Sequence, residues 1–119
     1  MLPKTHIQVY QELLSVLLTM RDRSTDVHPD ADALQKNYLR VQQVFQQAMS
    51  LNSDQLNSDT AFLWQSVQTE IYRALRLLET DLLFLRSSKQ AATVEQRLTN
   101  IQNRIEKVIG YCQAIVNEQ

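Results

Sequence analysis

The sequence has very few of the residues that build turns. Its 119 residues include one glycine and two prolines. Strands must be joined by turns, and turns are made largely from these residues, so an all-β fold is not expected. The seventeen leucines and fifteen glutamines both favour helices, and they point to an all-α protein instead.

Cysteine and long apolar runs are also scarce. Cys112 is the single cysteine and cannot form a disulfide within the chain, which is typical of a reducing compartment. The longest run of bulky apolar residues, 82–85, is far too short to span a membrane. The first residues, MLPKTHIQVYQE, place polar side chains where a signal peptide needs an apolar stretch. We therefore expect a cytoplasmic protein without a membrane span.

No part of the chain carries a large excess of charge. The formal net charge is −1, with five Lys and Arg against seven Asp and Glu in residues 1–60, and seven against six in residues 61–119. Neither half could neutralise a run of phosphates, so nucleic-acid binding is not expected. Binding to an anionic membrane surface is disfavoured for the same reason.

Apolar residues recur at helical spacing in four segments. These run from about Thr5 to Arg23, from Ala31 to Leu51, from a start within Asn52–Ser58 to Arg86, and from Gln90 to Val116. The connections are short, so consecutive helices should be antiparallel. We predict one all-α domain over residues 1–119. It should be an antiparallel up-down four-helix bundle in which the long third and fourth helices project beyond the other two.

Several residues are candidates for capping these helices. Thr5 and Gln8 have the spacing of a capping box. Asp30 or Asp32 can cap the second helix, and residues 52–58 hold several candidates for the third. For the fourth helix, the pairs at 87 and 90 and at 93 and 96 both have capping-box spacing, so two starting points stay open.

The apolar positions predict which face of each later helix lies inside. The second segment has Leu34, Tyr38, Val41, Phe45 and Ala48 on one face. The third has a seam of Leu63, Val67, Ile71, Ala74, Leu78 and Leu85, with Trp64, Leu75 and Leu82 along its margin. The fourth alternates four-three spacing through Val94, Leu98, Ile101, Ile105, Val108, Cys112 and Ile115, as supercoiled helices require. Asp81 falls within the third seam and needs a polar partner or an exposed edge.

The first segment carries two apolar stripes. One consists of Ile7, Tyr10, Leu14, Leu17 and Leu18, and the other of Val9, Leu13, Val16 and Met20. A helix that is apolar over more than half its circumference must touch neighbours on two sides. The second stripe is therefore a candidate interface for a homodimer.

The residue patterns that suggest known chemistry are weak in this chain. The tripeptide His28-Pro29-Asp30 also occurs in J-domain co-chaperones, where it lies between two helices. In those domains a basic, apolar helix comes directly before the tripeptide and a further short helix comes earlier, whereas only one predicted helix precedes it here. A turn followed by a helix cap is the favoured interpretation. The alternation of acids and His over residues 26–32 lacks the Gly and the final Glu of an EF-hand. His6 and Cys112 have no neighbouring ligands or bases in the sequence. We expect no metal, no cofactor and no enzymatic activity.

The third segment also has an outward face that is not uniformly polar. This face carries the candidate partner-binding residues Phe62, Thr69, Tyr72, Arg73, Arg76 and Leu83. Tyr and Arg are frequent at protein interfaces because they combine a large contact area with a polar end. The alternative is that this face packs on another part of the same bundle.

Residues 62–86 (FLWQSVQTEIYRALRLLETDLLFLR) and 91–93 (AAT) resemble the cyanobacterial PatD family. Residues 2–6 (LPKTH), 10–12 (YQE) and 111–112 (YC) share this resemblance, which covers most of the chain. The family is described as controlling the frequency of heterocysts, the nitrogen-fixing cells of a filament, and its proposed partner is the tubulin-like division protein FtsZ. The resemblance implies a non-enzymatic regulator that modulates FtsZ assembly. It carries no family binding residues onto this chain. A self-associating helical adaptor with an unrelated partner is the alternative.

Overall fold

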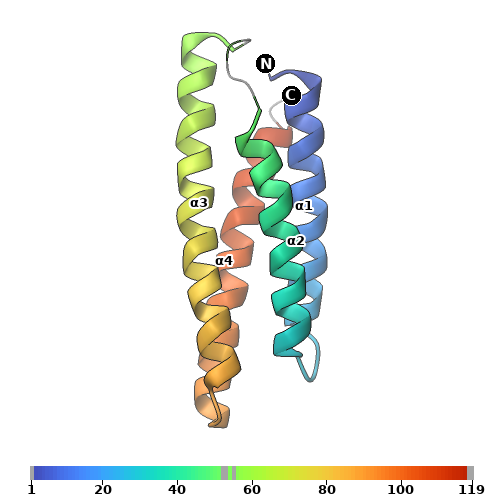
Figure 1. The fold of residues 1–119 in the computed structure, drawn as a ribbon, viewed down its shortest axis with the longest axis vertical. Coiled ribbons are helices and arrows are strands. Elements are labelled where there is room, and N and C mark those ends of the chain that lie inside the picture. Colours follow the sequence, from blue (N-terminus) through green and yellow to red (C-terminus); the bar gives the residue numbers. More distant parts are fainter. Residues whose placement is uncertain (1, 52–53, 55, 118–119) are drawn as a thin grey trace.

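The computed structural model describes residues 2–51, 54 and 56–117, which form four helices. These are α1 (Lys4–Ser24), α2 (Ala31–Met49), α3 (Ser58–Ser87) and α4 (Ala91–Asn117). Consecutive helices run in opposite directions in a molecule about 50 Å long and 20 Å wide (Figure 1). The prediction of an antiparallel all-α bundle is confirmed, and the described residues contain no strand. With 30 and 27 residues, α3 and α4 are the long helices, as predicted.

Two of the predicted helix caps are present, and those predicted for α1 and α4 are not. Neither candidate pair starts α4, since this helix begins at Ala91, whereas Ser87 ends α3 and Thr93 lies within α4. The side chain of Asp30 accepts a hydrogen bond from the backbone N–H of Asp32 and so starts α2. Asn57 caps α3 by accepting from the N–H of Thr60 at 2.8 Å, while Asn52 and Ser53 lie outside the described residues. The capping box at Thr5 is wrong, because α1 already begins at Lys4, after Pro3. Pro3 lacks an N–H and has its φ fixed near the helical value, so it favours this earlier start.

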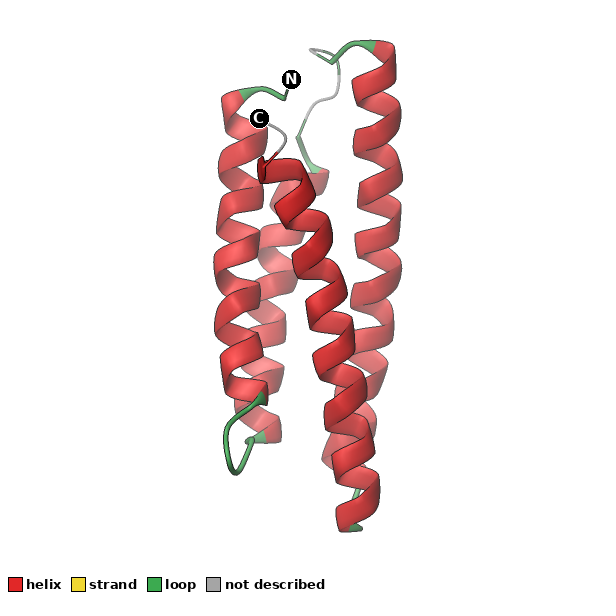
Figure 2. Cartoon of the chain, turned by 180° about the vertical axis from the view of Figure 1, so that it is seen from behind, coloured by secondary structure: helices red, strands yellow, loops and turns green. Residues whose placement is uncertain are grey.

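The four helices do not contact one another equally. α1 packs closely on α2 and α4, and α3 packs closely on α4. The contact between α2 and α3 is much smaller, although the two helices are consecutive in the chain. At one end of the molecule, α3 and α4 continue as a two-helix hairpin beyond α1 and α2 (Figures 1 and 2). The predicted projection of the long helices is therefore confirmed.

The buried face of α1 lies between the two stripes seen in the sequence. Tyr10, Leu13, Leu17 and Met20 have no exposed surface, and they alternate at three- and four-residue spacing. This is the spacing that keeps one seam against a neighbouring helix. The flanking residues Ile7, Val9, Leu14, Val16 and Leu18 are half-buried on both sides of the seam. Both stripes thus belong to one face, which α2 and α4 cover together.

The predicted inner faces of α2 and α4 are largely confirmed. All five predicted residues of α2 are buried, and so is Val44, which the sequence did not single out. In α4, the seam is buried from Ile101 to Ile115, and Cys112 is a core residue as predicted. Val94 and Leu98 are half-buried, because only α3 accompanies this part of α4 in the projecting hairpin.

Asp81 finds its polar partners across the hairpin. Its side chain is 9% exposed and lies within 3.8 Å of Arg97 and 3.6 Å of Arg104, both on α4. These distances exceed ordinary hydrogen-bond lengths, so the attraction is between charges. The two guanidinium groups are about one-third exposed and keep part of their hydration. An acid within the α3 seam is therefore paired by the neighbouring helix, as its position required.

At the opposite end of the bundle, Trp64 fills the space between the helices. Its ring makes edge contacts with His6 at 4.8 Å and with Tyr10 at 5.0 Å between centroids. The Tyr10 hydroxyl donates to Oε1 of Gln68, whose Nε2 donates to the carbonyl of Ala48. These contacts link α1, α2 and α3 where α2 and α3 are otherwise far apart.

None of the described helices is long and apolar enough to cross a membrane.

Candidate protein-binding surface

The buried seam of α3 determines which of its residues face outward. Leu75, Leu78, Leu82 and Leu85 are buried at alternating three- and four-residue spacing, in line with Ile71 and Trp64. Leu63 was predicted to belong to this seam, but it is 61% exposed. Trp64, seven residues before Ile71, takes the inner position instead, and its ring contacts His6 and Tyr10. Leu63 is consequently turned toward solvent.

A second line of residues runs along α3 beside the buried seam, on the side that faces α2. It also follows three- and four-residue spacing, and we call it the outer seam: Phe62, Gln65, Thr69, Tyr72, Arg76, Glu79 and Leu83. Phe62 is 71% exposed, Tyr72 48% and Leu83 56%. The alternative that this face packs within the bundle is thus contradicted for these three residues, since no other part of the described chain covers them.

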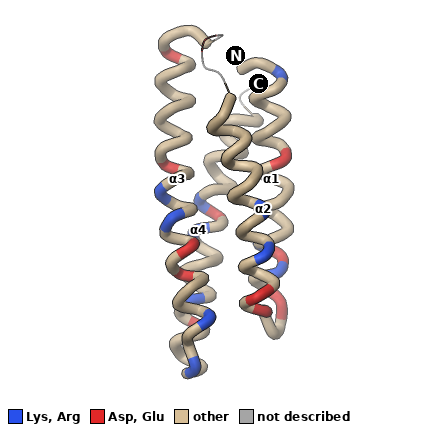
Figure 3. Tube along the Cα trace, viewed as in Figure 1, with Lys and Arg blue, Asp and Glu red and all other residues tan. Residues whose placement is uncertain are grey.

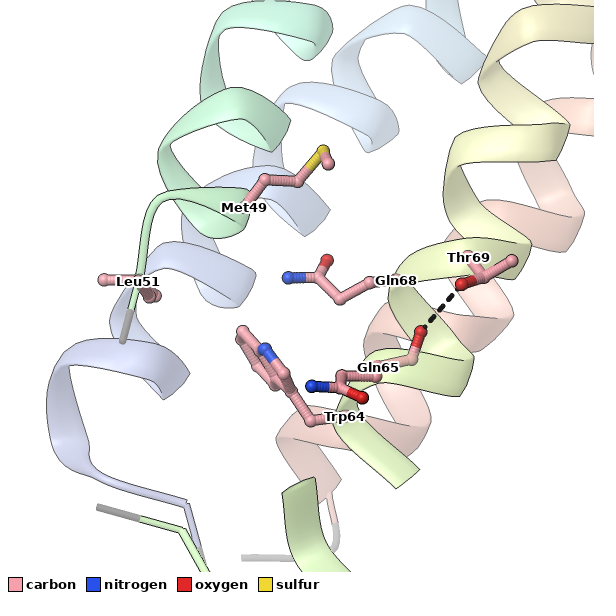
Figure 4. Close-up of a pocket in the computed structure, with 6 residues that line it drawn as sticks. All are labelled: Met49, Leu51, Trp64, Gln65, Gln68 and Thr69. Carbon is pink, nitrogen blue, oxygen red and sulfur yellow. Dashed lines mark hydrogen bonds between the residues drawn. The ribbon is translucent and has the colours of Figure 1, made fainter. Parts of the chain in front are cut away.

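The outer seam borders an open groove between α2 and α3. One part of the groove is a cavity of about 250 Å³ in which Tyr38, Phe45 and Leu75 are buried and Met49, Tyr72 and Arg76 lie at the rim. A neighbouring cavity of about 300 Å³ continues toward the end of the bundle past Met49. Figure 4 shows Met49 and Leu51 at the end of α2, opposite Trp64 and Gln68 of α3. The small contact between α2 and α3 leaves this groove open.

Tyr38 joins the two walls of the groove. Its hydroxyl lies 3.0 Å from the carbonyl of Leu75 and 3.1 Å from Oε2 of Glu79, with both oxygens as possible acceptors. Burial raises the pKa of Tyr38 above its usual value, and the nearby carboxylate of Glu79 raises this pKa further. The hydroxyl therefore stays protonated and holds the Glu79 carboxylate at the groove.

The two predicted arginines of this surface have different surroundings. Arg73 lies 3.2 Å from Glu70, one helical turn earlier, and both side chains are well exposed. Arg76 lies 6.0 Å above the ring of Tyr72, within the range of a cation–π contact. Among the described residues, Arg76 has no ion pair within 4.0 Å, so its charge faces the groove without a close carboxylate.

Charge is distributed very unevenly over the molecule. No charged residue stands between Arg40 and Asp54 or between Asp59 and Glu70, so the last turns of α2 and the stretch of α3 that follows its first turn are neutral. In Figure 3 the upper half of the bundle carries few charged positions, and most of the Lys, Arg, Asp and Glu lie in the lower half. The upper groove is therefore lined by neutral polar and apolar side chains, Arg76 brings a charge to its lower part, and Glu79 is held next to it by Tyr38.

A further set of exposed apolar residues lies along the other edge of α3, beside α4. Leu63, Glu70, Leu77 and Phe84 follow one another at seven-residue intervals. Glu70 is thus the one charged residue in an otherwise apolar line. Leu77 and Phe84 are each 47% exposed, and the guanidinium of Arg97 lies 4.6 Å over the Phe84 ring. The sequence placed Leu77 and Phe84 only at the margin of the outward face, because it did not show which edge of α3 faces α4.

All six candidate partner-binding residues lie at exposed or half-exposed positions on α3. Phe62, Thr69, Tyr72, Arg76 and Leu83 belong to the outer seam, and Arg73 lies beside it on the most outward line of the helix. The structure thus brings together the residues that the sequence grouped. Their role in binding stays a prediction. The missed part of the surface is its α2 wall, where Met49 lines the groove and is about half exposed.

The candidate dimer residues on α1 pack within the chain and do not form an exposed stripe, contrary to the prediction. Leu13 and Met20 have no exposed surface and belong to the core. Val9 and Val16 are half-buried and pack against that core. The stripe is therefore occupied within the chain, because α1 has close neighbours on two sides. It does not offer these four residues as a free surface for a second copy.

The sequence also contains residues that could in principle react or bind a metal, namely Cys112, His28 and Asp30. Burial raises the pKa of the Cys112 thiol to about 12, which keeps it protonated and poorly nucleophilic. His28 is exposed in the connection before α2, and Asp30 is the cap of that helix. Among the described residues, no three of His, Cys, Asp and Glu lie close enough together to hold a metal ion.

Comparisons with known proteins find no matching family model, no matching curated protein and no matching solved structure.

Proposed function

We propose that this chain is a non-enzymatic regulatory protein of the cytoplasm that binds a partner protein through the outer seam of α3. The partner we propose is FtsZ, whose assembly the chain would modulate and thereby influence the frequency of heterocysts. This choice of partner rests on the resemblance of residues 62–86 to the PatD family. The binding mode rests on the surface itself.

One observation supports the binding role above all others. Phe62, Tyr72 and Leu83 are about half exposed or more along a single line of α3, and the buried core does not include them. Keeping large apolar side chains in water is unfavourable by about 25 cal/mol for each Å² of apolar surface. Aromatic residues and Arg are enriched at protein interfaces, where they supply most of the binding energy. A partner that covers this line would remove the unfavourable exposure.

The arginines give this surface a preference for acidic partners. FtsZ-type polymers are acidic, and the planar guanidinium group can hold a carboxylate through two hydrogen bonds. Tyr72 lies beside Arg76 and offers a flat contact with few rotamers to fix on binding. Both arginines are exposed, so their attraction for a carboxylate should weaken when salt screens it.

The first prediction concerns these two arginines. The variant Arg73→Glu/Arg76→Glu should bind purified FtsZ at least about tenfold more weakly, because two attractive charges become repulsive at an interface. Titration of labelled FtsZ at low and high salt would measure this loss. Circular dichroism should stay unchanged, since both side chains are exposed on a helix that is packed on its other side.

The variant Arg23→Glu/Lys107→Glu is the matched control, because it makes the same change in net charge at exposed positions on α1 and α4. It should bind FtsZ as the unaltered protein does. Equal weakening of both variants would show that only overall charge matters. Unchanged binding of the Arg73/Arg76 variant would rule out this surface, and no binding by the unaltered chain would rule out FtsZ as the partner.

A further inference from the structure

The middle of the outer seam contains four side chains in a symmetric order. Tyr72, Arg76, Glu79 and Leu83 follow one another at four-, three- and four-residue spacing. Tyr72, Arg76 and Leu83 are exposed and Glu79 is half-buried at the groove. Read along the helix, the order is apolar, basic, acidic, apolar. Because the spacing matches that of packed helices, these four positions could all meet one neighbouring helix.

This order is complementary to itself when a second α3 runs in the opposite direction. With the midpoint between residues 77 and 78 as the centre, Tyr72 of one helix faces Leu83 of the other, and Arg76 faces Glu79. The two-fold symmetry repeats each contact, so the pairing gives two apolar contacts and two contacts between opposite charges. A parallel pairing would instead place each arginine opposite its own copy and each glutamate opposite its own copy, which is unfavourable.

We propose that a second copy of this chain covers the α2–α3 groove by antiparallel pairing of the two α3 helices, with a two-fold axis between Arg76 and Glu79. In this arrangement residues 68–87 of the two helices overlap, a length of about 30 Å at the helical rise of ~1.5 Å per residue. Thr69 then faces Arg86, so no like charges are opposed along the outer seam.

The rest of the groove fits this occupant. Met49 and Gln46 of α2 line the groove, and Leu39 precedes Gln46 by seven residues and so lies on the same side of α2. Leu39 and Met49 are about half exposed, and each would gain cover from the second α3. Tyr38 holds the Glu79 carboxylate in place through its hydroxyl, so the acidic partner for Arg76 is already ordered before the copies meet. Such preorganisation lowers the entropy lost on binding.

This self-association does not depend on the proposed partner. It uses Tyr72, Arg76 and Leu83, which the partner surface also includes, so the second copy and FtsZ would compete for the groove. Measurements on the isolated chain test the dimer alone, and a failure there leaves the partner proposal standing. Conversely, a dimer without FtsZ binding would remove the partner proposal and keep this one.

The second prediction uses exchanged charges. Arg76→Glu alone and Glu79→Arg alone each place like charges across the two-fold axis, so each variant should raise the dimer dissociation constant at least about tenfold. A one-to-one mixture of the two variants should dimerise again, because each residue 76 then faces an opposite charge at residue 79. The double variant on one chain should dimerise as well. Sedimentation equilibrium and light scattering over a range of concentrations would measure all four.

Two leucine variants supply a control that does not touch Glu79 or its hydrogen bond. Leu83→Arg should weaken the dimer, whereas Leu77→Arg should not, because Leu77 lies on the edge of α3 toward α4 with similar exposure. Circular dichroism checks that each variant is folded. The proposal is overturned if the unaltered chain is a monomer up to about 1 mM, because this concentration exceeds the dissociation constants of most specific protein contacts. It is also overturned if Leu83→Arg and Leu77→Arg have equal effects, or if folded charge variants fail to recover as a mixture.

Discussion

At the scale of single residues, three buried side chains that lose protons at high pH affect the stability of the bundle. Burial raises the pKa of Tyr10 and Tyr38 above the usual 10.0, and it raises the pKa of Cys112 from 9.0 to about 12. In the unfolded chain these groups are exposed to water and ionise at their ordinary values. Between the unfolded and folded pKa values, the unfolded state binds fewer protons, so its relative free energy falls as the pH rises.

The third prediction follows from this difference. The free energy of unfolding should not change through these groups below about pH 9, and it should decrease above that pH, first through Cys112 and then through the tyrosines. Each group contributes a slope of up to about 1.4 kcal/mol per pH unit. Urea unfolding at a series of pH values would measure it. Above pH 10, Tyr38→Phe should reduce the slope by the contribution of one titrating group. An unchanged slope would contradict the burial of that hydroxyl.

At the scale of elements, α4 contains a residue that weakens its own helix. Gly110 lies within α4 at an exposed position, one residue before Tyr111. A methyl group added at Gly110 would meet no other atom within 4 Å. The glycine therefore has no packing role in the described part of the chain. Its backbone freedom in the unfolded state lowers helix stability without a compensating contact.

The fourth prediction is that Gly110→Ala stabilises the protein by about 1 kcal/mol, the usual difference between Gly and Ala inside a helix. The midpoint of thermal or urea unfolding should rise accordingly. A decrease in stability would mean that another molecule approaches the backbone at this position and that the added methyl group obstructs it. Comparison of the oligomeric state of both proteins would distinguish that case.

At the scale of the whole molecule, the core becomes thinner toward one end. In the middle of the bundle, Ile101 and Ile105 of α4 are completely buried. In the projecting hairpin only α3 and α4 face each other, and Leu98 keeps part of its surface exposed. The groove between α2 and α3 adds a second open region along the side. The bundle is therefore a four-helix core that is open along the α2–α3 groove and continues into a two-helix extension.

The fifth prediction compares the two regions. Ile105→Ala should lower the free energy of unfolding by about 2–5 kcal/mol, as truncations of fully buried aliphatic side chains do. Leu98→Ala should cost about 1–2 kcal/mol, because less apolar surface returns to water. Chemical unfolding of the two variants would establish the order. Equal costs would show that the hairpin is covered in solution by something outside the chain.

Much of the fold is determined by the sequence alone. The spacing of apolar residues predicted four helices to within a few residues of their ends, because a helix must place its apolar side chains on one face. The buried residues of α2 and the central residues of α4 follow from the same rule. The location of Cys112 in the core and the need for a polar partner at Asp81 were also predictable, since both depend only on position within a seam.

The outward face of α3 could likewise be found from the sequence, because the residues opposite a buried seam must point away from it. Phe62, Tyr72 and Leu83 are large side chains on that face and indicate a candidate binding surface. The α2 wall of the groove could not be found in this way. Met49 lies next to a regular buried face, and the small contact between α2 and α3 leaves it about half exposed.

The tertiary structure decided which helices are neighbours and how far each pair stays in contact. Periodicity within one helix cannot show whether a flanking residue meets a second helix or water, and this is why the stripe with Leu13 and Met20 was assigned to a dimer although it is core. For the same reason Leu63 was placed inside, whereas its neighbour Trp64 is the residue that packs on α1. Local spacing fixes the faces of each helix. The packing of the whole chain determines which of those faces stay open, and the proposed binding surface depends on that packing.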